Sequence, residues 1–320
     1  MSRVRTATTL ALVAVVAGAV VALAHATKPG RNGKIVYQSS PPHRLWVVSA
    51  DGTGLRKLTT TKGPQRDDMN PDWSPDGSKV AFERCQKSCQ VWTINGDGTG
   101  LKRLGTCNEC GEPAWSPNGK LIAFFHHWGA FQDEQSEFAE IFVMKADGSG
   151  IRQLTHVTAN KPFTAETHRP AWSPDGKQLV FEVLNGPTGD PAKGRALFVV
   201  DANGSNLRQL TPWELSGGGK ADWSPNGRLI LFRSMSPVHE AHGNLYTIHP
   251  DGSGLKRLTN YPEPKAVGTG SFSPDGQWIT FNRFTTTPYP SIFVMRANGT
   301  GVRQVVQGKI GFVPDWGSAR

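Results

Sequence analysis

The sequence has little of three things: charge, cysteine and long hydrophobic runs. Charged residues make up 19% of its 320 residues, 4 are cysteines, and no apolar run after residue 26 is long enough to span a membrane. It also lacks Gly-x-Ser-x-Gly, the turn that carries the nucleophile of many serine hydrolases, so that chemistry is not expected. Turn formers are abundant instead: 36 Gly and 23 Pro beside 37% hydrophobic residues indicate a packed core with many turns.

The first 26 residues have the layout of a secretory signal peptide. Arg3 and Arg5 form a short basic region, an uncharged run follows from Leu10 to Leu23, and Ala24-His25-Ala26 has the pattern of a cleavage site. An uncleaved membrane anchor is the alternative, although the run is shorter than the ~20 residues that a spanning helix needs. We therefore expect an exported protein that is periplasmic, extracellular or surface-associated, with residues 27–320 as one domain.

One unit is repeated through the rest of the chain. Its marker is Trp-Ser-Pro-Asp-Gly, with Phe for Trp or Asn for Asp in some copies; the copies begin at Trp73, Trp115, Trp172, Trp223 and Phe272. Two apolar runs follow each copy, the second ending in an Asp-Gly or Asn-Gly turn, and then a short run that alternates apolar residues with Lys or Arg. Such runs and turns are typical of β-hairpins. Each unit thus predicts a four-stranded antiparallel sheet of the length of a propeller blade.

The burial pattern of the runs orders the strands within a unit. The basic last strand is predicted to be the outer edge, and the two middle strands, apolar on both faces, are predicted to lie between neighbouring sheets. The first strand is often preceded by a proline (Pro71, Pro113 and Pro170), which a sheet tolerates at an edge, so it is predicted to line a central channel. The repeated Trp is predicted to pack between blades.

The two ends of the chain hold complementary parts of one more unit. The chain enters the pattern at Asn32, in a second strand, and finishes at 314–317 with a first strand that nothing follows. Pairing of the two ends would complete a sixth blade and hide the last free edge. The sequence therefore predicts an all-β, six-bladed β-propeller of four-stranded antiparallel blades, closed by the C-terminal strand completing the N-terminal blade.

The repeated unit resembles that of the TolB-like, WD-repeat-like propellers. The resemblance rests on Trp-Ser-Pro-Asp-Gly, the apolar strand after it, and a segment such as 141–148, Ile-Phe-Val-Met-Lys-Ala-Asp-Gly, and it extends from Lys34 to Trp316. It implies the fold and no single function, because one fold hosts many activities. Similar units occur in peptidases of the prolyl oligopeptidase group. No hydrolase domain and no α/β domain of the TolB kind is expected here, so neither peptidase activity nor the role of TolB carries over.

The net charge of +9, or about +7 without Arg3 and Arg5, is carried largely by the predicted outer strands. Their cations are Arg56, Lys57, Lys102, Arg103, Arg152, Arg208, Lys256, Arg257 and Arg303. Spread around a circumference, they fit solvated edge protection better than a nucleic-acid groove. We expect no nucleic-acid partner, while a weak attraction to acidic polymers or membrane surfaces stays open.

The four cysteines are predicted to form disulfides because the protein is exported. Cys85 and Cys89 flank the loop between the middle strands of the second blade, and Cys107 and Cys110 lie in the loop that leaves that blade. Local bridges, Cys85–Cys89 and Cys107–Cys110, are preferred. Cross-paired bridges, a four-thiolate zinc site and a redox role for Cys107 and Cys110 are the alternatives.

Two groups of residues are candidate sites. Long insertions at 125–140, 155–169 and 182–195 fall on one face, where binding residues usually lie. The first insertion holds weak candidates for metal ligands, for which ordinary surface polarity is the preferred explanation: His126, His127, Asp133, Glu134 and Glu137. Positions three residues before each aromatic are predicted to converge in a polar collar at the channel mouth: Asn70, Glu112, Arg169, Lys220 and Thr269. Their mixed charge suits a peptide, a carboxylate-bearing ligand or ordered water, and a rim of mutual salt bridges is the alternative.

We expect a non-catalytic scaffold that presents its loop-rich face and channel mouth to a protein or peptide partner. Binding of a carbohydrate or other small ligand in the axial pocket is one alternative, and a metal-assisted polysaccharide lyase or hydrolase is another. An enzyme would need a metal or a carboxylate pair in a concave pocket, and no repeated position supplies one. No cofactor, a monomer and no transmembrane domain beyond the signal segment are expected.

Overall fold

The computed structural model describes residues 30–60, 66–128, 138–157, 165–185, 194–236, 239–262, 266–284 and 290–319. Apart from one short 3-10 turn, η3 (Trp213–Leu215), the regular structure of these residues is β-strand. None of them forms a helix with the length and apolarity to span a bilayer. The predicted signal segment, residues 1–26, lies outside the described residues and remains a prediction.

The strands pair in antiparallel sets of four, each running from an inner strand to a two-residue outer strand. Three sets are β24 (Phe312–Ser318), β1 (Asn32–Gln38), β2 (Leu45–Val48), β3 (Arg56–Lys57); β4 (Asp67–Trp73), β5 (Lys79–Cys85), β6 (Cys89–Asn95), β7 (Lys102–Arg103); and β8 (Cys110–Trp115), β9 (Leu121–Trp128), β10 (Phe138–Lys145), β11 (Arg152–Gln153). Three more are β12 (Ala165–Trp172), β13 (Gln178–Asn185), β14 (Arg195–Asp201), β15 (Arg208–Gln209); β16 (Gly217–Trp223), β17 (Ile230–Ser236), β18 (His239–Ile248), β19 (Lys256–Arg257); and β20 (Val267–Phe272), β21 (Trp278–Arg283), β22 (Ser291–Arg296), β23 (Arg303–Gln304). The third and fourth sets count as one eight-stranded sheet because β10 and β12 share a single parallel pair, Ala139 with Glu166.

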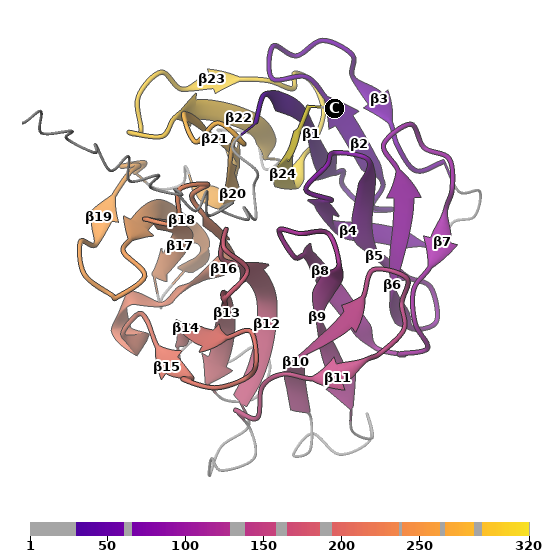
Figure 1. Ribbon diagram of the computed structural model, residues 1–320. Helices are drawn as coiled ribbons and strands as arrows, with labels where there is room; N and C mark the ends of the chain where they lie inside the picture. The colour runs from indigo at the N-terminus through magenta and orange to yellow at the C-terminus, as the bar shows by residue number, and fades with distance from the viewer. Residues whose placement is uncertain are drawn as a thin grey trace, which may run out of the picture.

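The sets stand side by side around a central axis, with the inner strands facing that axis and the two-residue strands at the periphery (Figure 1). Each inner strand contacts the inner strands of the sets before and after it, and β24 contacts both β20 and β4. The last strand, β24, pairs with β1, which places Ile35 opposite Trp316. The predicted order of strands, from channel to rim, is thus observed in every set.

The repeated turn is held by its own side chains. In the copy at 172–176, the Ser173 hydroxyl accepts a hydrogen bond from the backbone N–H of Gln178 at 2.9 Å, and Asp175 accepts one from Lys177 at 3.0 Å. Asn118 accepts the same bond from Lys120 at 2.9 Å. Because an amide oxygen can replace the carboxylate here, Asn and Asp interchange between copies.

These turns and the Asp-Gly or Asn-Gly turns lie at the same end of the molecule. Gln178, which follows the first kind of turn, pairs with Asp201, which precedes the second kind. We call this end the turn face and the opposite end the loop face. The strands reach further into the predicted insertions than expected, with β9 extending to Trp128 and β10 starting at Phe138, and these two strand ends lie at the loop face.

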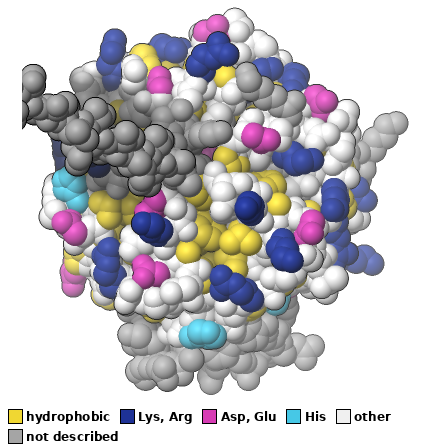
Figure 2. All heavy atoms as spheres, viewed as in Figure 1, with side chains coloured by type: hydrophobic (Ala, Val, Ile, Leu, Met, Phe, Trp, Pro, Cys, Tyr) yellow, Lys and Arg dark blue, Asp and Glu magenta, His cyan; other side chains and the backbone are white. Residues whose placement is uncertain are grey.

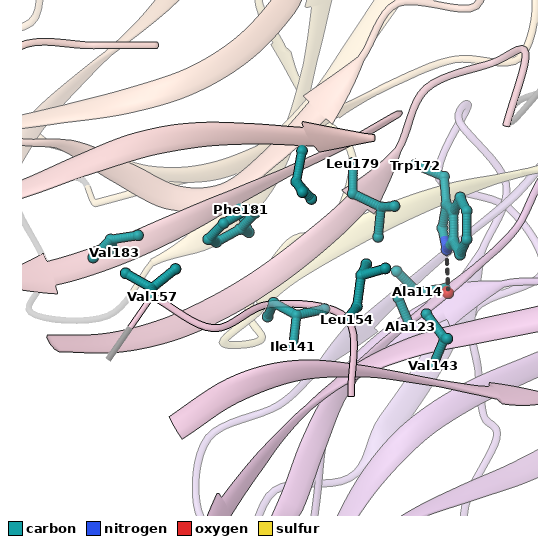
Figure 3. Packing of buried hydrophobic residues seen from close by; sticks show 11 residues of the cluster. Ala114, Ala123, Ile141, Val143, Leu154, Val157, Trp172, Leu179, Phe181 and Val183 are labelled. Carbon is teal, nitrogen blue, oxygen red and sulfur yellow. Dashed lines mark hydrogen bonds between the residues drawn. The ribbon is translucent and has the colours of Figure 1, made fainter. Parts of the chain in front are cut away.

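The core lies between neighbouring sets. In one interface, Trp172 packs with Leu179 and Phe181 of its own set against Ala114 and Ile141 of the preceding set (Figure 3). The Trp172 indole N–H donates to the Ala114 carbonyl at 3.2 Å. The prediction that the repeated Trp packs between blades is confirmed.

The outer-strand cations do more than protect an edge. The Arg303 guanidinium donates to the Ala50 carbonyl at 2.7 Å, and Arg152 donates to the Ala202 carbonyl at 3.2 Å. Arg56 and Arg208 make the same kind of bond to a turn carbonyl of the following set. The first cation of these strands therefore fastens its set to the next one, a role that the sequence analysis missed.

The preferred cysteine pairing is confirmed. Cys85 and Cys89 face each other across β5 and β6 and form one disulfide, and Cys107 and Cys110 form the other. The four-thiolate zinc site is therefore wrong. Disulfides fit an oxidising, exported location.

Candidate functional site: the axial channel

The collar residues are set by a bulge in the inner strands. In β4, β8 and β12 the pairing register shifts around Asn70, Glu112 and Arg169. These three residues have left-handed backbone conformations, with φ of 49°, 49° and 54°. A proline follows each of them, and it can lie in a bulge because it has no N–H to contribute to the ladder.

The backbone N–H groups at the bulges donate hydrogen bonds to side chains of neighbouring sets. Gln38 accepts from Asn70 at 2.8 Å, and Glu83 accepts from Glu112 at 3.3 Å. Glu182 accepts from Gly219 at 3.1 Å. These three acceptors were missed by the sequence analysis. Each of the three acceptors directly follows the buried aromatic residue of the second strand in its set. A polar residue at the end of an apolar run is therefore the sequence signal that could have identified them.

Arg169 lies between two carboxylates at the centre of the collar. Its guanidinium contacts Glu112 at 3.3 Å and Glu182 at 2.8 Å, and Arg195 contacts the other oxygen of Glu182 at 2.9 Å. The Glu182 side chain is fully buried, whereas that of Arg169 is 34% exposed. Burial alone would raise the pKa of Glu182, but the two guanidinium groups hold it below its usual range.

His168 extends the same network. Its two ring nitrogens lie 3.2 Å from Glu112 and 3.1 Å from Glu166. Burial alone would lower the pKa of His168, but the carboxylate of Glu112 and the hydrogen bonds raise it to about 10. Glu112 in turn is held at a pKa of about 2 against the effect of burial, chiefly by His168 and Arg169. At neutral pH this part of the channel holds paired ions.

Glu83 differs from its neighbours because no cation among the described residues forms an ion pair with it. It accepts a hydrogen bond from the Asn70 side chain at 2.8 Å. Burial and the nearby Glu112 charge raise the pKa of Glu83 to about 7. Glu83 and Glu112 are therefore adjacent carboxyl groups with widely separated pKa values.

Lys220 does not join the collar. The bulge of β16 contains one residue more than the others, so Gly219 occupies the equivalent position and Lys220 is displaced toward the turn face. Its ammonium group reaches β4, where it contacts the Pro71 carbonyl at 2.9 Å and Asp72 at 3.1 Å, and it lies 3.6 Å from Asp315 of β24. Burial alone would lower the pKa of Lys220, but Asp315 and Asp72 raise it.

A layer of aspartates surrounds Lys220. Asp72 accepts a hydrogen bond from the backbone N–H of Trp115 at 2.8 Å, and Asp315 accepts one from the backbone N–H of Trp73 at 2.8 Å. Asp222 accepts the N–H of Phe272 at 2.6 Å. Burial raises the pKa of Asp72 to about 6 despite the Lys220 charge, and burial and Asp315 raise the pKa of Asp222 to about 7.

Of the five predicted collar residues, four lie at the collar level. Asn70, Glu112 and Arg169 are joined through Glu83 and Glu182, whereas Thr269 bonds to Asn282 of its own set, its N–H donating at 3.0 Å. The predicted rim of mutual salt bridges is present between Glu112 and Arg169. The aspartate layer was not predicted, although Asp stands directly before the aromatic residue in three of the six inner strands.

The predicted metal ligands do not form a site in the described residues. His126 packs on the Phe142 ring, with 5.0 Å between centroids, and His127 donates its backbone N–H to the Glu109 carbonyl at 2.9 Å. The three acidic candidates, at 133, 134 and 137, lie outside the described residues. Within the described part of the chain, the group with metal-like spacing is Glu83, Cys85 and Cys89, and its two sulfurs are joined in a disulfide.

Hollows of different size open on the turn face. One of about 820 Å³ lies beside Trp73, Trp278 and Trp316, and one of about 590 Å³ lies beside Trp115. The hollow around Lys220 and the aspartates measures only about 50 Å³. One water needs roughly 10–15 Å³ of such space, so this part of the channel is large enough for ordered water.

Comparison with known proteins supports the fold more than the function. No family model matches the chain. It is 27% identical over 281 residues to a TolB homologue of Chlorobium luteolum, with 87% of this chain and 57% of the relative covered. The solved structure of TolB from Acinetobacter baumannii matches with a TM-score of 0.69 and 17% identity, covering 90% of this chain and 67% of that one. The chain has the TolB-like β-propeller fold.

Other relatives of this TolB-like propeller carry different names. An uncharacterized peptidase, YuxL of Bacillus subtilis, is 24% identical over 222 residues, 67% of this chain and 29% of that protein. An oligogalacturonate lyase solved in complex with manganese matches with a TM-score of 0.55 at 12% identity, covering 88% of this chain and 80% of that one. The chain spans less than two thirds of the length of these curated relatives.

Proposed function

We propose that this chain is an exported, non-catalytic binding scaffold, a six-bladed propeller closed by β24, that uses the collar of its loop face to bind a peptide segment of a protein partner. The observation that carries the proposal is the state of Arg169. Its guanidinium is fixed by two carboxylates and is still 34% exposed. A charge that is both held in place and open to solvent is suited to recognising a complementary group without a large loss of entropy.

The charges around Arg169 support binding rather than chemistry. Glu112 and Glu182 each contact two cationic side chains. Carboxylates held ionised in this way are poor proton donors at neutral pH. The network therefore fixes the collar in one geometry and leaves mixed charge at the channel mouth.

The test is capture of a partner and its dependence on the collar. The exported protein, purified as its host makes it, is used to capture proteins from the same compartment, and the affinity of the captured protein is then measured for Arg169→Gln. Loss of a desolvated charge pair should weaken binding at least about tenfold. Lys177→Gln, whose side chain is 81% exposed on the turn face, is the control and should bind normally. Equal affinity of both variants would refute the role of the collar.

A second candidate function rests on Glu83 and Glu112. Adjacent carboxyl groups with pKa values of about 7 and about 2 resemble an acid and base pair. Because one structural match is an oligogalacturonate lyase, acidic polysaccharides are the substrates to test. Cleavage that is lost in Glu83→Gln while the fold is retained would favour this function over the scaffold.

We further propose that export proceeds through residues 1–26, as the sequence predicts. The two disulfides support an oxidising location. N-terminal sequencing of the exported protein distinguishes a chain that starts at Thr27 from one that retains the apolar run as an anchor. A protein found entirely in the cytoplasm with reduced cysteines would contradict the proposal.

A further inference from the structure

The turn face carries a repeated set of exposed aliphatic side chains. They stand at the same place in each repeat, directly before the outer strand, and 36% to 47% of each is exposed: Leu101, Ile151, Leu207, Leu255 and Val302. In the described part of the chain, these five are the exposed large hydrophobic residues. The equivalent Leu55 is partly buried against the core between its set and the preceding one. An exposed apolar residue is unremarkable singly, but five equivalent ones on one end of the molecule form a pattern.

Cations surround these aliphatic residues. One or two Lys or Arg residues follow each of them in the outer strands, and further exposed cations stand at the turns and strand ends of the same face: Lys34, Lys79, Lys120, Lys145, Lys177, Arg228 and Arg296. In Figure 2, which looks onto this end, Lys and Arg side chains are spread over the face and outnumber Asp and Glu. The turn aspartates, such as Asp147, accept hydrogen bonds from their own turns.

The arrangement fits a flat surface better than a groove. Equivalent positions at one end of sets placed around an axis lie near one plane, with the aliphatic residues and cations distributed across it. A nucleic acid requires a contiguous strip of cations, whereas an anionic bilayer is itself a plane of negative charge. Aliphatic side chains inserted at headgroup level, beside basic ones, are the means by which peripheral proteins bind such a surface.

The position of the N-terminus gives an independent argument. Asn32 pairs with Ser318, and the Ala319 N–H donates to the Arg31 carbonyl at 2.8 Å, so the described chain starts on the turn face. Only six residues, 24–29, lie between the first described residue, Gly30, and the apolar run that ends at Leu23. Six residues span at most roughly 20 Å. A retained run would therefore hold the turn face against the membrane.

We propose that the turn face is a docking surface for an anionic lipid bilayer. This goes beyond the binding of a partner at the loop face and does not depend on it. Docking in this orientation places the collar on the side away from the membrane, where a partner has access to it.

The experiment measures binding to vesicles. The exported protein is mixed at low salt with vesicles of phosphatidylglycerol and phosphatidylcholine, or of phosphatidylcholine alone, and the bound fraction is determined by flotation. One variant combines Lys120→Gln, Lys177→Gln and Arg228→Gln. A second combines Leu101→Ser, Leu207→Ser and Leu255→Ser, and Lys87→Gln on the loop face is the control.

We expect binding to the anionic vesicles that falls with salt. The triple cation variant should bind about a hundredfold more weakly, since each cation near an anionic surface contributes roughly fivefold. The triple aliphatic variant should also lose at least about tenfold, and the control should change less than about twofold. Thermal unfolding of each variant shows whether it is folded.

Three outcomes would overturn the proposal. Equal binding of wild type and both triple variants to the two vesicle types would assign membrane association to residues 1–26 alone. No binding to either vesicle type would exclude the docking surface outright. Displacement by duplex DNA, with full binding of the aliphatic variant, would instead assign the cations to a polyanion.

Discussion

We predict that the substitution Asp222→Asn, in the aspartate layer, raises the free energy of unfolding at neutral pH and leaves it unchanged in acid. Asp222 has a pKa of about 7, raised by burial and by Asp315. In the unfolded chain an aspartate has a pKa near 3.9, so between these values the folded state holds a proton that the unfolded state releases. Stability therefore falls as pH rises from about 4 to about 7. Asp222→Asn removes this loss, because the amide is neutral and its oxygen can still accept the Phe272 N–H.

The magnitude follows from the size of the shift. A displacement of about 3 pKa units corresponds to about 4 kcal/mol at 1.36 kcal/mol per unit. Asp222 is partly exposed, and solvent screening reduces the value, so a gain of about 2 kcal/mol is expected at about pH 8. At about pH 4, where the carboxyl group is protonated in the folded state, the gain should nearly vanish.

The assay is urea unfolding of wild type and variant at several pH values between about 4 and 8. Asp175→Asn is the matched control, since Asn stands at the equivalent turn position in two other repeats and accepts the same bond. The control should leave the unfolding midpoint unchanged at every pH. A variant Asp222→Asn that loses stability at about pH 8, or that changes it equally at all pH values, would refute the reasoning.

Two further predictions concern the collar and a turn. Glu112→Gln should cost about 2 kcal/mol at neutral pH, because it removes one of the two carboxylates that contact His168 and one of the two that contact Arg169. The pKa of His168 should fall from about 10, as NMR titration of the ring protons would show, and an unchanged His168 titration would contradict the pairing. In wild type, the stabilisation from His168 is present below about pH 6.5 and is lost as pH rises toward 10. Gly148→Ala should destabilise by at least about 2 kcal/mol, because φ is 94° and the added Cβ would lie 2.5 Å from the backbone nitrogen of Gly105. Gly308→Ala, where nothing lies within 4 Å, should cost about 1 kcal/mol in the same thermal unfolding assay, and equal losses would contradict the close-approach argument.

Features that depend on local chemistry were predicted from the sequence. Asp-Gly turns, the two disulfides and the packing of Trp172 follow from residue types and their spacing, because each involves a short segment or a repeated contact. The placement of Lys220 could not be predicted by counting from the aromatic residue, since the bulge of β16 holds one residue more than the other bulges. A bulge changes which side chain reaches a given level, and its size depends on the tertiary pairing.

Roles that depend on a neighbouring set were also missed. The alternation of apolar and basic residues shows that Arg152 and Arg303 belong to an outer strand. It does not show that a turn carbonyl of the next set comes within reach of each guanidinium. Likewise, the sequence shows Glu182 only as an acidic residue at the end of an apolar run. The packing of the sets is needed to show that two arginines form ion pairs with it.

Lys220 lies between the two faces for which we propose separate functions. It belongs to β16, whereas its partners Asp72 and Asp315 belong to β4 and β24, which are not the neighbours of β16, so its side chain crosses the axis. The space left at this level is about 50 Å³. A peptide that enters the collar at Arg169 therefore meets a charged barrier before it can reach the turn face. In the arrangement that we propose, a partner at the loop face and a membrane at the turn face lie on opposite sides of Lys220, so they do not compete for space.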